Sequence, residues 1–258
     1  MTPFHVLIPA RLASTRLPEK ALADLAGKPL IVRVWERACA AGAASVHVAT
    51  DSNRIADAVR YAGGRVVMTA TGHDSGTSRL SEAARKLGLD GDEIVVNVQG
   101  DEPAVPIACL RQLAGLLGDS LDARMATLWV DLADAAEWRN PNVVKLVTRA
   151  DGRVLYFSRA PIPARRAGGW PEALAHRHVG LYAYRAGALA DWPGLPPSPL
   201  ETSESLEQLR ALQGGWEIVC QRALEPIPPG VDTAEDLEAM QRYFTAAGSG
   251  SAAIEAED

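Results

Sequence analysis

Three cationic side chains lie close together near the start of the chain. Arg11, Arg16 and Lys20 fall within residues 9–20, a segment that follows an apolar run and also carries Ser14. The whole chain has a net charge of -6, so a local group of cations needs an anionic partner. The oxygens of a triphosphate would suit forked guanidinium groups and an ammonium group. The segment lacks the GxxxxGK(S/T) pattern of a Walker loop and the GxGxxG pattern, and a solvated basic surface loop remains the alternative.

Acidic side chains at two places are candidates for binding a hard cation. Asp101 and Glu102 follow another apolar run, within residues 96–103, and Asp232 lies far along the chain. Carboxylates, water and phosphate oxygens are the ligands that Mg2+ takes in proteins. Because a single carboxylate rarely holds Mg2+, Asp101 needs a partner such as Asp232, although the sequence does not show that the two meet. The alternatives are an ordinary turn after the apolar run and a helix N-cap at Asp232.

Two further polar segments offer recognition groups. Residues 73–79 form a predicted turn that contains Gly76. The exposed backbone of this turn could recognise a base edge with support from Arg79. The alternative is an ordinary loop before a helix. His176 and His178 share one face of a candidate strand, but no third zinc ligand is suggested nearby. His178 is therefore interpreted as an anion contact or as a polar residue of an edge strand.

The elements that position these groups alternate between strand and helix in the first part of the chain. Short apolar runs predict buried strands, and apolar residues at helical spacing predict helices between them. Such alternation indicates parallel βαβ units, in which ligands bind beyond the carboxyl ends of the strands. The cationic segment, the polar turn and the acidic pair all follow predicted strands, so we expect them to converge. The predicted strands are 4–8, 45–49, 65–68 and 93–98, with helices at 30–41, 55–62 and 80–87.

The second part of the chain is less regular. Glu201 and Gln208 flank the start of a predicted helix, where a solvated helix face is the alternative to a binding role. We interpret residues 1–245 as a single domain and expect residues 246–258, which are small, polar and acidic, to form a disordered tail. The predicted strands are 125–130, 143–147, 154–157, 179–184 and 216–221, with helices at 202–212 and 233–244.

The composition argues against several classes of protein. An acidic chain is a poor candidate for nucleic-acid binding, which needs a basic face. Cys39, Cys109 and Cys220 are widely spaced and odd in number, which argues against a disulfide framework or zinc site and for a reducing compartment. There is no apolar run of about 18 residues, and the N-terminal run lacks the basic residues of a signal peptide. We therefore expect a cytoplasmic protein without a membrane or nucleic-acid partner.

A series of segments resembles the 3-deoxy-manno-octulosonate cytidylyltransferase family, also called CMP-Kdo synthetase. They run in family order from about Phe4 to Met240, nearly the whole chain. The first segment also fits the wider sialic-acid cytidylyltransferase group, whereas VQGDEP, YFSRAPIP and SPLETSESLEQLR point to the Kdo branch. The segments are PARLASTRLPEK at 9–20, ATD at 49–51, HDSGTSR at 73–79, VNVQGDEP at 96–103, NPNVVK at 140–145, LYFSRAPIP at 155–163, RHVGLYAYR at 177–185, SPLETSESLEQLR at 198–210 and GVDTAEDL at 230–237.

The resemblance implies a fold, a reaction and partners. The fold would be Rossmann-like and α/β, a nucleotide-diphospho-sugar transferase fold with a mostly parallel sheet, helices on both faces and a smaller mixed region at about 120–215 for sugar-acid binding and dimerisation. The anomeric hydroxyl of Kdo would attack the α-phosphorus of CTP, giving CMP-Kdo and pyrophosphate and so activating Kdo for lipopolysaccharide biosynthesis. Mg2+ would be the cofactor, and the protein would be a homodimer.

The resemblance also implies roles for individual residues. Arg16, Lys20 and Asp101 would be catalytic, the two cations by stabilising the leaving pyrophosphate. The residues it assigns are Arg11, Ser14, Arg16 and Lys20 to the CTP phosphates; Ser75, Gly76 and Arg79 to the cytosine end; Gln99 between nucleotide and sugar; Asp101 and Asp232 to Mg2+; and Arg159, His178, Tyr182, Glu201 and Gln208 to the sugar-acid pocket.

The chain departs from the family pattern at Ser78, where the family usually has an acidic residue. If that acid orients Arg79, base recognition here depends on other groups. Two alternatives stay open: a cytidylyltransferase for a related sugar acid, such as an amino-substituted Kdo or a sialic-acid-like sugar, and a non-catalytic nucleotide-sensing module on the same fold. An oxidoreductase is disfavoured because its glycine fingerprint is missing.

Overall fold

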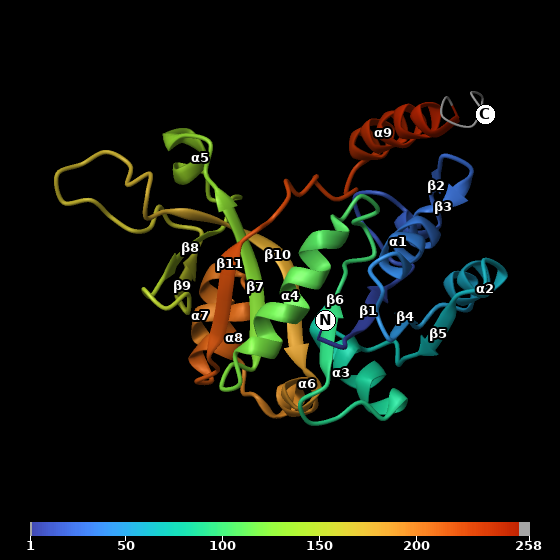
Figure 1. The fold of residues 1–258 in the computed structure, drawn as a ribbon, viewed down its shortest axis with the longest axis horizontal. Helices are drawn as coiled ribbons and strands as arrows, with labels where there is room; N and C mark the ends of the chain where they lie inside the picture. Colours follow the sequence, from blue (N-terminus) through green and yellow to red (C-terminus); the bar gives the residue numbers. More distant parts are fainter. Residues whose placement is uncertain (1, 253–258) are drawn as a thin grey trace.

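A large mixed sheet forms the centre of the molecule, in a computed structural model that describes residues 2–252 (Figure 1). Its strand order is β11-β7-β10-β6-β1-β4-β5, and β8 and β9 extend it from β10. The half that contains β6, β1, β4 and β5 is parallel, as the alternation of strands and helices predicted. These strands are β1 (His5–Ala10), β4 (Ser45–Thr50), β5 (Arg65–Met68) and β6 (Ile94–Asn97).

Helices cover both faces of the sheet, because successive residues of a buried strand point to opposite sides. Val6 and Ile8 of β1 belong to one core with residues of α1, α2 and α4, while Leu7 belongs to a second core with residues of α3, α6 and α8. The bounds of these helices are α1 (Leu30–Cys39), α2 (Asn53–Tyr61), α3 (Gly76–Leu87), α4 (Ile107–Asp119), α6 (Ala186–Asp191) and α8 (Gln208–Gln213).

The less regular second part joins the same sheet. Strand β10 (His176–Arg185) runs antiparallel between β6 and β7, so the expected mixed region is continuous with the parallel half. Near the strand ends lie the short helix α5 (Ala135–Arg139) and the 3-10 turn η2 (Trp192–Gly194). The other strands are β7 (Met125–Asp131), β8 (Lys145–Thr148), β9 (Val154–Ser158) and β11 (Ile218–Arg222).

Three sequence expectations about helices need correction. The predicted helix at 202–212 is two helices, α7 (Pro199–Glu204) and α8, because Ser205 has a left-handed backbone with a φ of 51° and ends the first. Helix α4 was not anticipated. Helix α9 (Ala234–Ala252) continues past the expected start of a disordered tail at 246, and residues 253–258 lie outside the described part of the chain.

Helix α9 packs at the edge of the parallel half, next to a small hairpin. The hairpin joins β2 (Asp24–Leu25) and β3 (Lys28–Pro29) after the short 3-10 turn η1 (Lys20–Leu22). A small apolar core holds the hairpin, α1 and α9 together; it includes Leu25, Leu30, Val231 and Met240. The connection from β11 to α9 runs along the carboxyl edge of the sheet (Figure 1). Asp232 on this connection pairs with Lys20 of the segment after β1. Along the described residues, no helix combines the length and hydropathy needed to cross a bilayer.

Candidate active site

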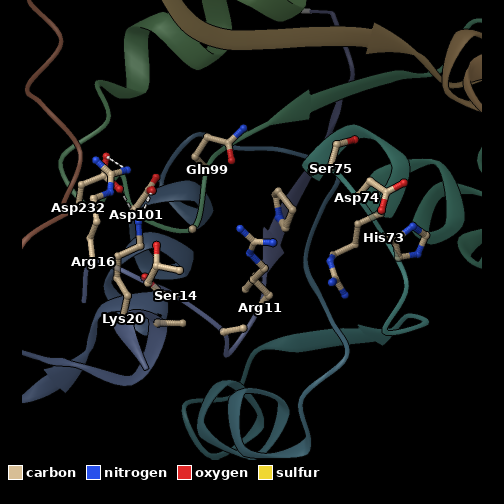
Figure 2. A pocket seen from close by; sticks show the side chains of 18 residues that line it. Arg11, Ser14, Arg16, Lys20, His73, Asp74, Ser75, Gln99, Asp101 and Asp232 are labelled. Carbon is tan, nitrogen blue, oxygen red and sulfur yellow. Dashed lines mark hydrogen bonds and ion pairs between the residues drawn. The ribbon is translucent and has the colours of Figure 1, made fainter. Parts of the chain in front are cut away.

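A polar cavity of about 380 Å3 opens at the carboxyl ends of β1 and β6. Its size falls within the range of small-molecule sites. Figure 2 shows Asp101, Asp232, Arg16 and Lys20 at one end and His73 to Ser75 at the other, with Arg11 and Gln99 between them. The lining residues are Pro9, Ala10, Arg11, Ala13, Ser14, Thr15, Arg16, Lys20, Ala21, His73, Asp74, Ser75, Gly76, Arg79, Gln99, Gly100, Asp101 and Asp232. Segments predicted to converge from strand ends thus share one cavity.

Two carboxylates meet at the acidic end of this cavity. The Nζ of Lys20 lies 2.6 Å from Asp101 Oδ2 and 2.9 Å from Asp232 Oδ1, and Arg16 Nη2 lies 3.0 Å from Asp232 Oδ2. Burial alone would lower the pKa of Lys20, but its hydrogen bonds to both carboxylates outweigh burial and raise it. The ammonium group is therefore charged, and it occupies the point on which both carboxylates converge.

The acidic end fits a divalent cation of the Mg2+ type. Asp101 and Asp232 supply carboxylate oxygens that converge on one cationic group, and Mg2+ is commonly held by one or two carboxylates plus water and substrate phosphates. No group of three or more His, Cys, Asp or Glu side chains that could hold a metal is found among the described residues. Glu102 lies off the cavity lining, and burial, followed by the charge of Asp101, raises the pKa of Glu102 to about 8.

At the opposite end, the first turn of α3 faces the cavity. Ser75 is the N-cap of this helix and accepts a hydrogen bond from the backbone N–H of Ser78 at 3.1 Å. Arg79 is buried; its guanidinium lies 2.9 Å from Asp51 Oδ2 and 2.5 Å from Thr69 Oγ1. Residues at the ends of β4 and β5 therefore orient Arg79, and no acid is needed at position 78.

Ser78 belongs to a second small network. Its hydroxyl lies 2.6 Å from His73 Nδ1, and His73 Nε2 lies 2.5 Å from Glu82 Oε2. Burial would raise the pKa of Glu82, but hydrogen bonds from Lys86, the backbone N–H of Ala70 and His73 lower it to about 2. Glu82 is therefore ionised and holds His73 at the cavity rim. Sequence reasoning missed Glu82 and left Asp51 without a role, although Asp51 is part of the ATD segment at a strand end.

The five residues expected in a sugar-acid pocket lie outside the cavity lining, directly after β9, on β10, on α7 and on α8. His178 on β10 is 3.1 Å from Thr127 Oγ1 through Nε2. Burial lowers the pKa of His178 to about 3, so this imidazole is neutral at physiological pH. It can therefore contact an anion only as a neutral hydrogen-bonding group. Tyr182 lies beside it, with 5.5 Å between the ring centroids.

Arg159 and Glu201 make structural contacts in this conformation. Arg159 donates from Nε to the carbonyl of Glu204 at 2.6 Å, and from its other nitrogens to the carbonyls of Pro141 (3.0 Å) and Ser205 (3.3 Å). The guanidinium thus closes the carboxyl end of α7 at the break before α8. Glu201 forms a two-bond ion pair with Arg210, with both distances 2.7 Å.

Glu207, which sequence reasoning did not single out, connects the two regions. Its Oε2 accepts a hydrogen bond from the Thr77 hydroxyl at 2.8 Å, next to Gly76 of the cavity. Its Oε1 is buried without a hydrogen-bond partner among the described residues, as is Asn97 Oδ1. Both residues lie near Tyr182. Asn97 pairs with Tyr182 across the sheet. Burial is the largest cause that raises the pKa of Tyr182, and the charges of Tyr184 and Glu207 raise it further. Buried oxygens without partners beside the cavity offer hydrogen-bonding capacity to a ligand.

Comparisons with known proteins point to one family. A family model described as Cytidylyltransferase matches residues 5–218. A 3-deoxy-manno-octulosonate cytidylyltransferase from Leptothrix cholodnii is 51% identical, covering 93% of this chain and 91% of the relative, and one from Vibrio vulnificus is 50% identical, covering 94% and 98%. A solved CMP:2-keto-3-deoxy-manno-octonic acid synthetase in complex with CTP is 41% identical, with a TM-score of 0.87 and coverage of 95% of this chain and 99% of that one.

Proposed function

Because this chain belongs to the 3-deoxy-manno-octulosonate cytidylyltransferase family, we propose that it transfers CMP from CTP to 3-deoxy-D-manno-octulosonate and releases pyrophosphate. One observation carries the proposal: a single cavity joins three cations and two converging carboxylates to a helix N-terminus that carries a buried arginine. This arrangement suits a nucleoside triphosphate along its whole length. Kdo activated in this way would serve lipopolysaccharide biosynthesis.

The nucleotide lies, in this proposal, with its phosphates toward Arg11, Ser14, Arg16 and Lys20. The base lies toward Ser75, Gly76 and Arg79, where the backbone N–H groups of the first turn of α3 and the fixed guanidinium offer hydrogen-bond donors. Gln99, just beyond β6, lies between these two regions (Figure 2). In this proposal it would contact both the nucleotide and the sugar. In this proposal Asp51 and Thr69 orient Arg79 in the absence of an acid at position 78.

Charge neutralisation and alignment are the main contributions of the protein to this reaction. Asp101 and Asp232 would hold Mg2+, which when bound neutralises phosphate charge and favours the ionised form of the attacking hydroxyl. Arg16 and Lys20 contact the β- and γ-phosphates and stabilise the negative charge that develops on the leaving pyrophosphate. The electron pair of the broken P–O bond leaves with pyrophosphate as the sugar oxygen joins the α-phosphorus.

The sugar acid is placed between the cavity and β10. His178, Tyr182 and Gln208 supply neutral hydrogen-bonding groups there, and we add Glu207 because its Oε1 is buried without a hydrogen-bond partner among the described residues and its charge acts on Tyr182. In the conformation described, Arg159 bonds the carbonyl of Glu204 and Glu201 pairs with Arg210, so both hold α7 and α8 in place; their expected contacts with the sugar stay predictions. The sugar-acid pocket is thus formed by the mixed part of the sheet, and the triphosphate site by the parallel part.

Two further expectations extend the family resemblance. We infer a homodimer, because residues 160–175 project away from the body of the molecule and carry the exposed Leu174, which is 63% accessible (Figure 1). Sedimentation equilibrium tests this, and a monomer at micromolar concentration would contradict it. We also infer a cytoplasmic location, where CTP is available, which cell fractionation tests.

Pyrophosphate release tests the proposed function directly. Each of the four nucleoside triphosphates is offered with and without Kdo, at fixed Mg2+, and a second panel replaces Kdo with amino-substituted Kdo or a sialic acid. We expect release with CTP and Kdo together and little with other pairs. Release with another sugar acid only would favour the related cytidylyltransferase. CTP binding without release for any sugar acid would favour the nucleotide-sensing module.

A further inference from the structure

Asp232 lies on the long connection between β11 and α9, whereas its expected partner Asp101 lies in the turn shortly after the buried strand β6. The chain leaves β11, crosses the carboxyl edge of the sheet and enters α9 directly after residue 233 (Figure 1). Connections are more mobile than the elements that they join, so a carboxylate on one needs support for its backbone. The contacts on either side of Asp232 show where that support comes from.

The carboxylate of Asp236 holds the backbone on the C-terminal side. Its Oδ2 accepts hydrogen bonds from the backbone N–H of Asp232 at 3.0 Å and of Thr233 at 2.9 Å. In return, the Thr233 hydroxyl accepts a hydrogen bond from the Asp236 N–H at 3.2 Å. This is a reciprocal capping box at the start of α9, with aspartate in place of the usual glutamate. An ordinary box reaches back to the N-cap residue, but this one also reaches the residue before it.

The N-terminal side of Asp232 is fixed by the other expected metal ligand. The Val231 N–H donates to the carbonyl of Asp101 at 2.8 Å, so the two aspartates are linked through their backbones. Val231 is fully buried, and with Met240 of α9 it packs on Leu25 and Leu30. The docked helix, the capping box and this one backbone bond together determine where the Asp232 carboxylate lies relative to Asp101.

We propose that Asp236 is a positioning residue that sets the Asp232 carboxylate for divalent-cation binding. It is absent from the cavity lining and acts only through the backbone of Asp232 and Thr233. The inference rests on the metal role proposed above for Asp232. Groups that orient metal ligands in this way are typically worth about 10–100-fold in metal affinity.

The experiment compares Asp236→Ala and Asp236→Asn with two matched controls. Thr233→Ala removes the other half of the capping box and weakens the start of the helix comparably, but leaves the bond to the Asp232 N–H intact. Glu235→Ala removes the same charge from the same exposed turn. Mn2+ is titrated into the full-length protein with saturating CTP and no sugar acid, and free Mn2+ is read by electron paramagnetic resonance against a CTP-only blank. Melting temperatures and the Mg2+ dependence of the rate are measured alongside.

We expect Asp236→Ala to weaken Mn2+ binding at least about tenfold, Asp236→Asn to weaken it less, and both controls to stay within about twofold. CTP binding in the absence of metal should change little in all four. Equal loss of Mn2+ affinity in Thr233→Ala and Asp236→Ala would overturn the inference, since helix stability alone would then explain it. Asp232→Asn serves as the reference. If this variant binds Mn2+ like the wild type, the metal role of Asp232 is wrong. If Asp232→Asn binds Mn2+ more weakly but Asp236→Ala binds it normally, only the positioning role of Asp236 is wrong.

Discussion

The ammonium group of Lys20 lies 2.6 Å from Asp101 and 2.9 Å from Asp232, at the point where two carboxylates converge. A cation carried by the protein itself thus neutralises the pair that is proposed to hold Mg2+. In the proposed function, a divalent cation held by these carboxylates would displace Lys20, and the CTP phosphates, which need a cation, are placed in the same cavity. The proposal therefore implies that metal binding and nucleotide binding are coupled through Lys20, which leads to the first prediction.

Lys20→Met should tighten metal binding and slow the reaction. Without nucleotide, Asp101 loses its ion pair and Asp232 keeps only its pair with Arg16, so Mn2+ should bind several-fold more tightly than to the wild type in a paramagnetic resonance titration. With both substrates, kcat should fall more than KM for CTP rises, because a cation that meets charge on a leaving group acts mainly in the transition state. Lys28→Met, which removes an exposed lysine paired with Glu36, is the control. A variant with weaker Mn2+ binding, or with only KM altered, would contradict this coupling.

Asp101→Asn should abolish Mg2+-dependent turnover while the fold is kept. The substitution removes a charged oxygen ligand but preserves shape, and the loss should amount to at least about 100-fold in kcat/KM, or about 2.7 kcal/mol. Steady-state rates and circular dichroism together check it, with Asp57→Asn on the exposed face of α2 as a charge-matched control. Activity near that of the wild type would remove Asp101 from the metal site.

Arg159→Lys should raise KM for Kdo roughly tenfold, about 1.4 kcal/mol, and leave CTP binding unchanged. Lysine cannot reproduce the fork that reaches the carbonyls of Glu204, Pro141 and Ser205, so the break between α7 and α8 should loosen. The melting temperature should therefore fall as well, since partly buried carbonyls lose their donors. A raised KM with an unchanged melting temperature would instead indicate direct contact between Arg159 and the sugar carboxylate. Weakened CTP binding would place Arg159 outside the sugar-acid region.

His178 should make the fold sensitive to acid. Its pKa of about 3 in the folded protein lies below the ordinary value of 6.5, so the unfolded chain binds a proton first as pH falls. The stability that comes from keeping this imidazole neutral is complete above pH 6.5 and is lost progressively between pH 6.5 and about 3. At pH 5 the free energy of unfolding should be lower than at pH 7 by about 2 kcal/mol because of this residue. Urea unfolding gives the free energy of unfolding at pH 7 and at pH 5. The difference between these two free energies should be smaller for His178→Gln than for the wild type. Equal differences would mean that burial does not keep His178 neutral in the folded protein.

Local chemistry along the chain was enough to identify the nucleotide end of the site. Arg11, Arg16 and Lys20 follow a buried strand, and parallel strands present such segments at one edge, so their shared cavity was predictable. The strands of the parallel half were also predictable, and 65–68 matches β5 in full, because strands buried on both faces are continuous apolar runs. Periodicity could not detect the break at Ser205, since the leucines of the predicted helix, Leu206, Leu209 and Leu212, all follow it, and only the backbone shows the left-handed turn.

The sequence by itself determined which residue types stand at the strand ends, and hence a site for a nucleotide with charged phosphates. Only the tertiary structure decided which distant groups meet. Asp232 reaches Asp101 because α9 docks on the hairpin, and Arg79 is oriented by Asp51 because α3 packs on β4. Arg159, which is expected from the sequence to contact the sugar, donates hydrogen bonds to main-chain carbonyls, and no local sequence pattern reveals these bonds. Composition and spacing encode short-range preferences, whereas these pairings depend on sheet order and helix docking, which arise from packing of the whole chain.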